Sequence, residues 1–251
     1  MNDGTTKGWV RRIMGGSPKD GLRQKLAAFE NSFDYRFTVS YAKDGRNPIA
    51  QLCDKYGSDK GEIKTAGHPY SWQSMTYADF YWRLFRHARN GVTHVFECGL
   101  GTNNPGFESS MGTEGKPGAS LRVWRDYFPK ATIIGADIDK GVLFEEERIR
   151  TFFVDQTDSR SVEALWQSVG FGDFDLMIDD GLHEFEAGRC LFENSIAKLA
   201  PDGIYIIEDV NADDLPRYKA FFQPKDFIAS YVTLYRPRED SGDNNIIMIS
   251  R

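Results

Sequence analysis

Short apolar runs and longer segments with apolar residues at helical spacing alternate along the second half of the chain. Runs of this length are typical of buried strands, and the longer segments are typical of helices that cover a sheet. The predicted strands are 93–98, 132–136, 151–154, 175–178 and 204–207, and the predicted helices are 119–127, 142–148, 161–169, 184–199 and 214–222. This alternation predicts a doubly wound α/β fold with a mostly parallel sheet.

The last part of the chain predicts a different ending for the sheet. Two further apolar runs, 228–235 and 245–249, flank a polar turn at 237–243. Such a pair predicts an antiparallel hairpin. We therefore expect a Rossmann-like, mostly parallel seven-stranded sheet that closes with a C-terminal antiparallel hairpin.

The region before the first strand predicts helices instead, at 23–33, 48–56 and 77–89. Its first residues are polar and glycine-rich, a composition that is typical of frayed termini. These patterns divide the chain into a partly flexible N-terminal extension (1–50), a helical lid or cap segment (51–91) and the α/β domain (92–251).

Charge and composition bear on whether the chain binds nucleic acid or a membrane and on its compartment. The net charge of −6 over 251 residues disfavours a nucleic-acid backbone as the main partner, because phosphate binding needs a basic surface. The chain contains no apolar stretch of the ~20 residues that span a bilayer and no apolar secretory core near its N-terminus. Its three cysteines suit a reducing compartment. We expect a soluble cytoplasmic protein, and the aromatic N-terminal segment is compatible with a homo-oligomer.

Two predicted strands end in acids. Asp179 and Asp180 follow the strand 175–178, with His183 three residues later, and Glu208 and Asp209 follow the strand 204–207. In an open α/β sheet, ligands bind beyond the carboxyl ends of the strands. Neighbouring strands would bring Asp180, Glu208 and Asp209 together beside His183, which is a donor set for a divalent metal and a base for proton transfer.

The first predicted strand ends in a glycine turn. Glu97 precedes Gly99 and Gly101, but the third glycine of a dinucleotide fingerprint is replaced by Asn104, which disfavours a nicotinamide cofactor. A long polar loop, 102–117, then delays the next helix. Loops of this length in compact domains are often functional.

Acids also end the next two strands. Asp137 can accept hydrogen bonds from ribose hydroxyls, and Asp155 and Gln156 are placed to meet an adenine amino group. A glycine turn with acid-tipped strands suits a nucleoside without phosphate. S-adenosylmethionine is such a ligand, and its sulfonium cation favours nearby carboxylates.

In this order, the motifs resemble those of the class I S-adenosylmethionine-dependent methyltransferases, in particular the metal-dependent O-methyltransferases that act on sugars of macrolide antibiotics and related glycosides. The resemblance runs from about residue 52 to residue 251. The matching segments are Lys55-Tyr56-Gly57-Ser58-Asp59-Lys60, Phe96-Glu97-Cys98-Gly99, the helix 119–129, Gly135-Ala136-Asp137-Ile138-Asp139, Asp155-Gln156, Ile178-Asp179-Asp180-Gly181-Leu182-His183 and Ile206-Ile207-Glu208-Asp209.

The resemblance implies roles for these residues. It implies an Mg²⁺-type ion held by Asp180, Glu208 and Asp209, with His183 as general base and a sugar or glycoside as acceptor. It also implies that Tyr56, Ser58 and Lys60 form a lid over the cofactor, with a surface turn as the alternative for this segment. The other predicted cofactor contacts are Glu97, Gly99, Gly101, Asp137, Asp155 and Gln156. The chain departs from the family pattern in the inserted loop 102–117 and in Leu182, where the family has a small serine.

Other functions remain open at this level. A catechol-like diol could be methylated with the same metal chemistry. A nicotinamide-dependent oxidoreductase and a binding subunit without catalysis are further alternatives, which the broken glycine fingerprint and the retained acids with His183 respectively disfavour.

Overall fold

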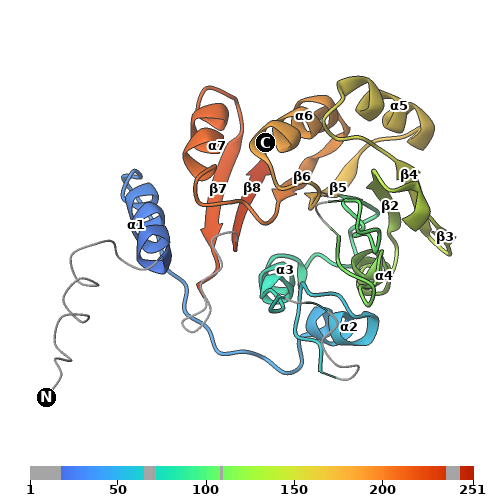
Figure 1. Ribbon diagram of the computed structural model, residues 1–251, viewed down its shortest axis with the longest axis horizontal. Helices are drawn as coiled ribbons and strands as arrows, with labels where there is room; N and C mark the ends of the chain where they lie inside the picture. The colour runs from blue at the N-terminus through green and yellow to red at the C-terminus, as the bar shows by residue number, and fades with distance from the viewer. Residues whose placement is uncertain (1–17, 65–69, 71, 108–109, 236–243) are drawn as a thin grey trace, which may run out of the picture.

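Within the part of the chain that the structure describes, eight strands form one sheet (Figure 1). Their spatial order is β3 (Glu145–Glu146), β4 (Ile149–Phe153), β2 (Thr132–Asp137), β1 (His94–Cys98), β5 (Phe174–Asp179), β6 (Leu199–Ile207), β8 (Asn245–Ser250) and β7 (Ile228–Thr233). From β4 to β6 all pairings are parallel, whereas β8 is antiparallel to both β6 and β7. The predicted fold class is confirmed, and the two-residue β3 adds an eighth strand.

This structure is a computed structural model that describes residues 18–64, 70, 72–107, 110–235 and 244–251. The predicted turn at 237–243 and the first 17 residues of the predicted extension lie outside these ranges. In the described ranges, we find no helix with the length and apolarity that a membrane span requires.

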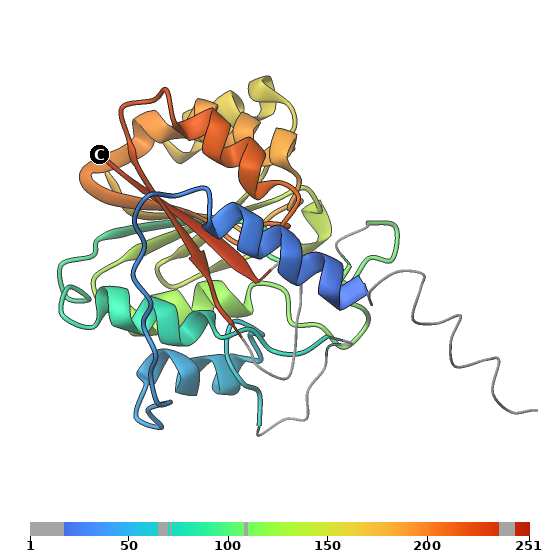
Figure 2. The same cartoon turned by 90° about the vertical axis from the view of Figure 1, so that its left-hand side faces the viewer.

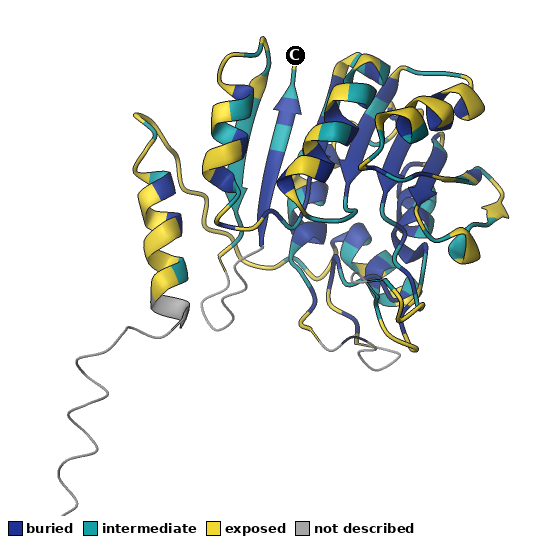
Figure 3. Cartoon of the chain, turned by 45° about the horizontal axis from the view of Figure 1, so that its top comes forward, coloured by how far each residue is buried: buried dark blue, intermediate teal, exposed yellow. Residues whose placement is uncertain are grey.

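Helices cover both faces of the sheet (Figures 1 and 2). One face carries α1 (Pro18–Glu30), α5 (Ser159–Val169), α6 (Phe185–Ser195) and α7 (Leu215–Phe222), and the other carries α2 (Pro48–Tyr56), α3 (Tyr77–Phe85) and α4 (Ala119–Tyr127). Successive strand residues therefore enter different cores: Val95 packs with α2, α3 and α4, and Phe96 packs with the opposite layer. Figure 3 shows the resulting burial of the central strands.

The predicted helix at 142–148 is wrong. A 3₁₀ turn (Lys140–Val142) and the short strand β3 occupy this region. The hydroxyl of Thr151 accepts a hydrogen bond from the Phe144 amide at 2.5 Å and donates one to its carbonyl at 2.6 Å, which draws the segment back along β4. Arg148 has a φ of 60°, and its guanidinium donates to the carbonyls of Phe128 and Ala131. These contacts favour a hairpin over a helix of charged residues.

The region 196–203 also differs from its prediction. Helix α6 ends at Ser195, a 3₁₀ turn follows (Ile196–Lys198), and β6 then begins at Leu199. Pro201 to Gly203, which lie between the predicted helix 184–199 and the predicted strand 204–207, are part of β6, whose pairing with β5 is irregular between Phe174 and Leu176. An irregular strand edge tolerates proline, which cannot donate to the ladder.

The strand register brings the acid-bearing strand ends side by side. Cys98 of β1 pairs with Ala136 of β2 on one side and with Asp179 of β5 on the other. The ladder continues beyond the strands, because the Asp180 amide donates to the Cys98 carbonyl at 2.8 Å and the Glu208 amide donates to the Asp179 carbonyl at 2.9 Å. The sheet thus delivers the glycine turn and both acidic pairs to one edge.

Candidate functional site

A cavity of about 990 Å³ opens at this carboxyl edge of the sheet. Ten of the residues predicted for a site line it: Ser58, Gly99, Gly101, Asp137, Asp155, Gln156, Asp180, His183, Glu208 and Asp209. The described lining does not include Tyr56 or Glu97. Tyr56 instead donates to Asp126 at 2.5 Å, between α2 and α4. Glu97 is fully buried beneath the cavity wall, where it accepts a hydrogen bond from Trp124 Nε1.

The glycine turn is shaped by close backbone contacts. Gly99 has a φ of 94°, and a Cβ there would lie 2.0 Å from the carbonyl oxygen of Asp180. Gly101 has a φ of 76°, and its Cβ would lie 2.2 Å from Sδ of Met111. Any side chain at either position would therefore both strain the backbone and collide with the cavity wall.

The predicted nucleoside contacts are held by hydrogen bonds to nearby groups. Asp137 accepts from the amides of Leu100 at 2.7 Å and Asp139 at 2.8 Å, and burial raises its pKa. Asp155 accepts from the amide and the hydroxyl of Thr157 at 2.9 and 2.6 Å. The loops on this side of the cavity are held by these hydrogen bonds, and each carboxylate already accepts bonds from neighbouring amides or a hydroxyl.

Gln156 links this side to the next strand end. Its Nε2 donates to Asp179 at 3.2 Å, and its Oε1 accepts from the amide of Leu182 at 2.9 Å. Asp179 itself is buried, so the two adjacent acids diverge: Asp179 faces the protein and Asp180 faces the cavity. Leu182, where the family has serine, contributes its backbone amide to this arrangement.

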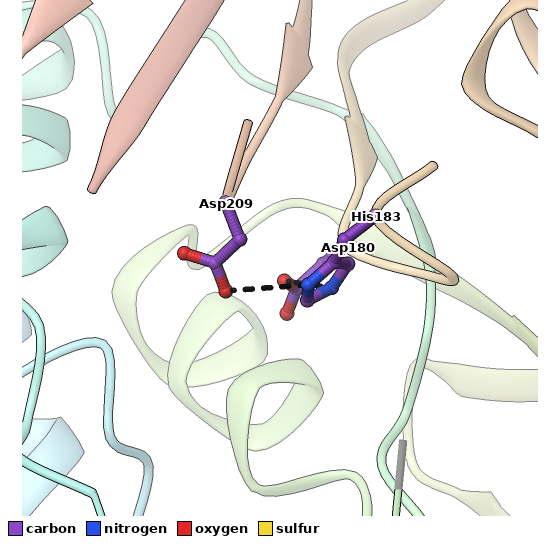
Figure 4. A group of neighbouring side chains, drawn as sticks. All are labelled: Asp180, His183 and Asp209. Carbon is purple, nitrogen blue, oxygen red and sulfur yellow. Dashed lines mark ion pairs between the residues drawn. The ribbon is translucent and has the colours of Figure 1, made fainter. Parts of the chain in front are cut away.

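Asp180, His183 and Asp209 form a compact group on the other side (Figure 4). One ligand atom from each lies within 4.8 Å of the others. His183 Nε2 lies 3.5 Å from Asp180 Oδ1, and His183 Nδ1 lies 3.8 Å from Asp209 Oδ2. His183 and Asp209 both have left-handed backbones, with φ values of 61° and 51°. Such conformations are uncommon outside glycine and cluster at functional sites.

The charges of this group act on one another. Burial favours the neutral imidazole, but the hydrogen bond to Asp180 and the charge of Asp209 outweigh it and raise the pKa of His183 to about 10. Burial raises the pKa of Asp209 to about 7. For Asp180, the charge of Lys60 and the hydrogen bond from His183 outweigh burial and lower the pKa to about 2. The protonation states of His183, Asp180 and Asp209 therefore depend on one another, and a cation bound to the carboxylates would change all three.

Lys60 is a further member of the site. Its Nζ lies 2.7 Å from Asp180 Oδ2 and 3.4 Å from Glu97 Oε1, and it donates a hydrogen bond to Glu208 Oε2. The lysine is only 4% exposed. We refer to Glu97, Asp180, Glu208 and Asp209 as the acid cluster. The sequence motif containing Lys60 predicted at most a cover for the cofactor, whereas the structure places its charge among these acids.

Two tyrosines of α3 complete the wall behind the acids. The Tyr81 hydroxyl donates to Glu208 Oε1 at 2.5 Å, and the Tyr77 hydroxyl donates to Asp209 Oδ1. Tyr81 lies in the predicted helix 77–89, in which the sequence predicts no site residue. The available signal was the hydroxyl itself, because a buried tyrosine usually finds a polar partner for it.

The inserted loop 102–117 forms part of the cavity wall. The Met111 amide donates to the Thr102 carbonyl at 2.7 Å, and the Gly118 amide donates to the Leu100 carbonyl at 2.8 Å, so both ends of the loop are tied down. Phe107 and Met111 line the cavity. The insertion therefore faces the space where a ligand would bind.

The donor set fits the groups that the motifs imply. Carboxylate oxygens are the ligands that Mg²⁺ prefers, and an imidazole lies beside them. The glycine turn and Asp137 share the same cavity, with room for a nucleoside and a second ligand. The cavity is larger than a typical nucleoside needs, since pockets for drug-sized ligands begin near about 300 Å³.

Comparison with known proteins adds independent evidence. No family model matches the chain. The 8-demethyl-8-alpha-L-rhamnosyl tetracenomycin-C 2'-O-methyltransferase of Streptomyces olivaceus is 30% identical over 183 residues, which are 72% of this chain and 43% of that protein. The demethylmacrocin O-methyltransferase of Streptomyces fradiae is 33% identical over 159 residues, which are 63% of this chain and 38% of that protein.

A solved structure agrees with the sequence relatives. The MycE methyltransferase from the mycinamycin biosynthetic pathway, in complex with Mg and SAH, superimposes with a TM-score of 0.58 at 25% identity. The match covers 81% of this chain and 54% of that one. The chain is homologous to these O-methyltransferases. The predicted family resemblance is confirmed, and the chain spans less than half of the length of the curated relatives it matches.

Proposed function

We propose that this chain is an S-adenosylmethionine-dependent and divalent-metal-dependent O-methyltransferase that methylates a hydroxyl of a sugar or glycoside. The observation that carries the proposal is one cavity that joins the glycine turn to Asp180, Glu208, Asp209 and His183. The printed names of the relatives, which include a rhamnosyl 2'-O-methyltransferase, support the sugar acceptor.

We assign the cofactor to the side of the cavity built by β1 and β2. Gly99 and Gly101 allow close approach of the ligand, and Asp137 offers carboxylate oxygens to the ribose. Asp155 and Gln156 lie farther along the same wall, where the adenine would contact them. Ser58 covers this side from the 51–91 segment, which we propose acts as a cap.

We assign the metal to Asp180 and Asp209, with Glu208 as the third ligand. All three side chains line the cavity at the ends of β5 and β6, and the compact group with His183 contains Asp180 and Asp209. When bound, S-adenosylmethionine would supply an electrophilic methyl group, and the divalent ion would supply positive charge beside the acceptor hydroxyl.

Residues of the chain itself would accept the proton and position the acceptor hydroxyl. Asp180 and Asp209 lie 3.5 and 3.8 Å from the His183 ring and raise the pKa of its imidazole to about 10, so without a bound cation the ring is protonated at neutral pH. A divalent ion on these carboxylates would offset their charge and lower that pKa, and the neutral imidazole would then accept the proton of the acceptor hydroxyl. The loop residues Phe107 and Met111 close the cavity wall and exclude water from the transfer. Because methyl transfer is an in-line displacement, holding the hydroxyl in position contributes much of the acceleration.

The acceptor test separates this proposal from its alternatives. The full chain would be incubated with S-adenosylmethionine carrying a deuterated methyl group and with a panel of glycosylated macrolides, nucleotide sugars and catechol. We expect mass-labelled product from a glycoside or nucleotide sugar, loss of product with a chelator, and recovery with Mg²⁺. Product from catechol alone would favour the diol alternative, and undiminished transfer in chelator would contradict the metal assignment.

Calorimetry with S-adenosylhomocysteine and with NAD addresses the oxidoreductase alternative. We expect heat of binding for S-adenosylhomocysteine and none for NAD, because Asn104 replaces the third glycine of a dinucleotide turn.

A further inference from the structure

Lys60 lies in a short loop that is anchored to the neighbouring helices. Its carbonyl accepts a hydrogen bond from the Ala78 amide at the start of α3, at 2.7 Å. The Ser58 amide donates to the Cys53 carbonyl of α2, at 3.0 Å. The backbone of the loop is therefore fixed, and the lysine side chain extends from it into the acid cluster.

The ammonium of Lys60 occupies a position between two of the proposed metal ligands. It contacts Asp180 Oδ2 at 2.7 Å and hydrogen-bonds to Glu208 Oε2. The other oxygen of Glu208 accepts from the Tyr81 hydroxyl at 2.5 Å. Both oxygens of Glu208 thus accept hydrogen bonds, and the ammonium lies between Asp180 and Glu208, where an ion bound to both carboxylates would have to lie.

The same position offers the ammonium a second partner. Glu97 is completely buried, and its Oε1 forms an ion pair with Lys60 Nζ at 3.4 Å, while the Ser120 hydroxyl is a further neighbour of this carboxylate. The other oxygen of Glu97 is taken by Trp124 Nε1. A small movement of the ammonium toward Glu97 would shorten this existing ion pair and so offset the lost contact with Glu208.

We propose that Lys60 is a built-in cation that competes with the divalent ion for Asp180 and Glu208. Without the ion, its ammonium holds these carboxylates together; when the ion binds, the ammonium withdraws to Glu97. This inference rests on the metal site of the proposed function.

The test is the affinity of the full chain for Mn²⁺, measured by electron paramagnetic resonance of the free ion. Lys60→Met removes the competing charge and keeps a side chain of similar length. We expect it to bind Mn²⁺ at least about tenfold more tightly than the wild type, because a positive charge next to the ligands has been removed. The matched control is Lys64→Met, an exposed lysine that pairs with Glu62 at 3.0 Å and should leave the affinity unchanged.

The outcomes separate this inference from the proposed function. If neither the wild type nor Lys60→Met binds Mn²⁺, the metal site itself is wrong. If both bind and Lys60→Met is equal or weaker, the metal site stands and the competition is wrong, because a lysine that merely supports the ligands would weaken binding when removed.

A second measurement does not depend on the folding of Lys60→Met. The ¹⁵Nζ signal of Lys60 in the wild-type chain, assigned by its loss in Lys60→Arg, is followed during titration with Mg²⁺. We expect the signal to shift with the same saturation curve as metal binding. An unchanged signal at saturating Mg²⁺ would overturn the proposal.

Discussion

The two sides of the cavity treat their carboxylates differently. On the side of β2 and β4, Asp137 accepts from two backbone amides and Asp155 accepts from Thr157. On the side of β5 and β6, the acids face one another, and burial raises the pKa of Glu208 well above its usual range. The first side needs no other ion to be stable, whereas the second gathers negative charge that calls for a cation. This difference supports the proposal that the first side binds the nucleoside, whereas the acids of the second side already surround the Lys60 ammonium.

The largest effect is expected from His183→Ala. Removal of a general base costs about 10²- to 10⁴-fold in turnover, and cofactor affinity should be intact because His183 lies on the other side of the cavity from Asp137. Turnover is measured with a glycoside acceptor, and affinity by calorimetry with S-adenosylhomocysteine. His87→Ala, which alters an exposed histidine at the end of α3, is the control. Full activity of His183→Ala would remove this residue from the mechanism.

The double variant Asp180→Asn, Asp209→Asn tests whether the β5 and β6 side of the cavity binds the metal. The pair should lose about 100-fold or more in Mn²⁺ affinity, since loss even of a supporting residue around a metal costs 10- to 100-fold. Binding of S-adenosylhomocysteine should change little. Asp202→Asn, an exposed acid in β6, serves as the control. Equal Mn²⁺ binding by the double variant and the wild type would contradict the metal assignment.

Asp137→Asn tests the nucleoside side. Hydrogen bonds to charged groups contribute about 1.5–3 kcal/mol, so we expect S-adenosylhomocysteine to bind roughly 10- to 100-fold more weakly. Mn²⁺ affinity should be unchanged in the same preparation. If this variant lost metal binding instead, the division of the cavity into two sides would be wrong.

The smallest effect is expected at Trp72, which stacks on Tyr70 with ring centroids 4.9 Å apart and lines the cavity. We predict that Trp72→Ala raises KM for a glycoside acceptor about three- to tenfold with little change in kcat, because an aromatic contact contributes roughly 0.5–1.5 kcal/mol. Tyr35→Ala, at a side chain that is 94% exposed, is the control. An unchanged KM would exclude Trp72 from the acceptor site.

Much of the fold followed from local pattern. Strands such as β5 were predicted because both faces of a central parallel strand are buried, which leaves a continuous apolar run in the sequence. The helix predicted at 142–148 failed because the contacts of Thr151 and Arg148, which come from tertiary structure, outweigh the local preference of a charged segment. Pattern alone carries no information on such contacts.

Some residues of the site could likewise be predicted from the sequence, and others could not. The acids at strand ends were predicted because the sheet topology alone brings them to one edge. Lys60 and Tyr81 were not assigned to the acid cluster, because their loop and helix reach it only through packing on α2 and α4. Tyr56, expected at the cofactor, pairs with Asp126 instead. A contact between Tyr56 and the cofactor remains a prediction, which calorimetry of a Tyr56 variant with S-adenosylhomocysteine can test.

The central claim is that cofactor and metal bind in one cavity. The most direct measurement is the broadening of the proton signals of bound S-adenosylhomocysteine by Mn²⁺, which requires no knowledge of the acceptor. Our account predicts strong broadening with the wild-type chain and none with the Asp180→Asn, Asp209→Asn variant. Tight binding of S-adenosylhomocysteine to the wild type with signals that Mn²⁺ leaves sharp would contradict it.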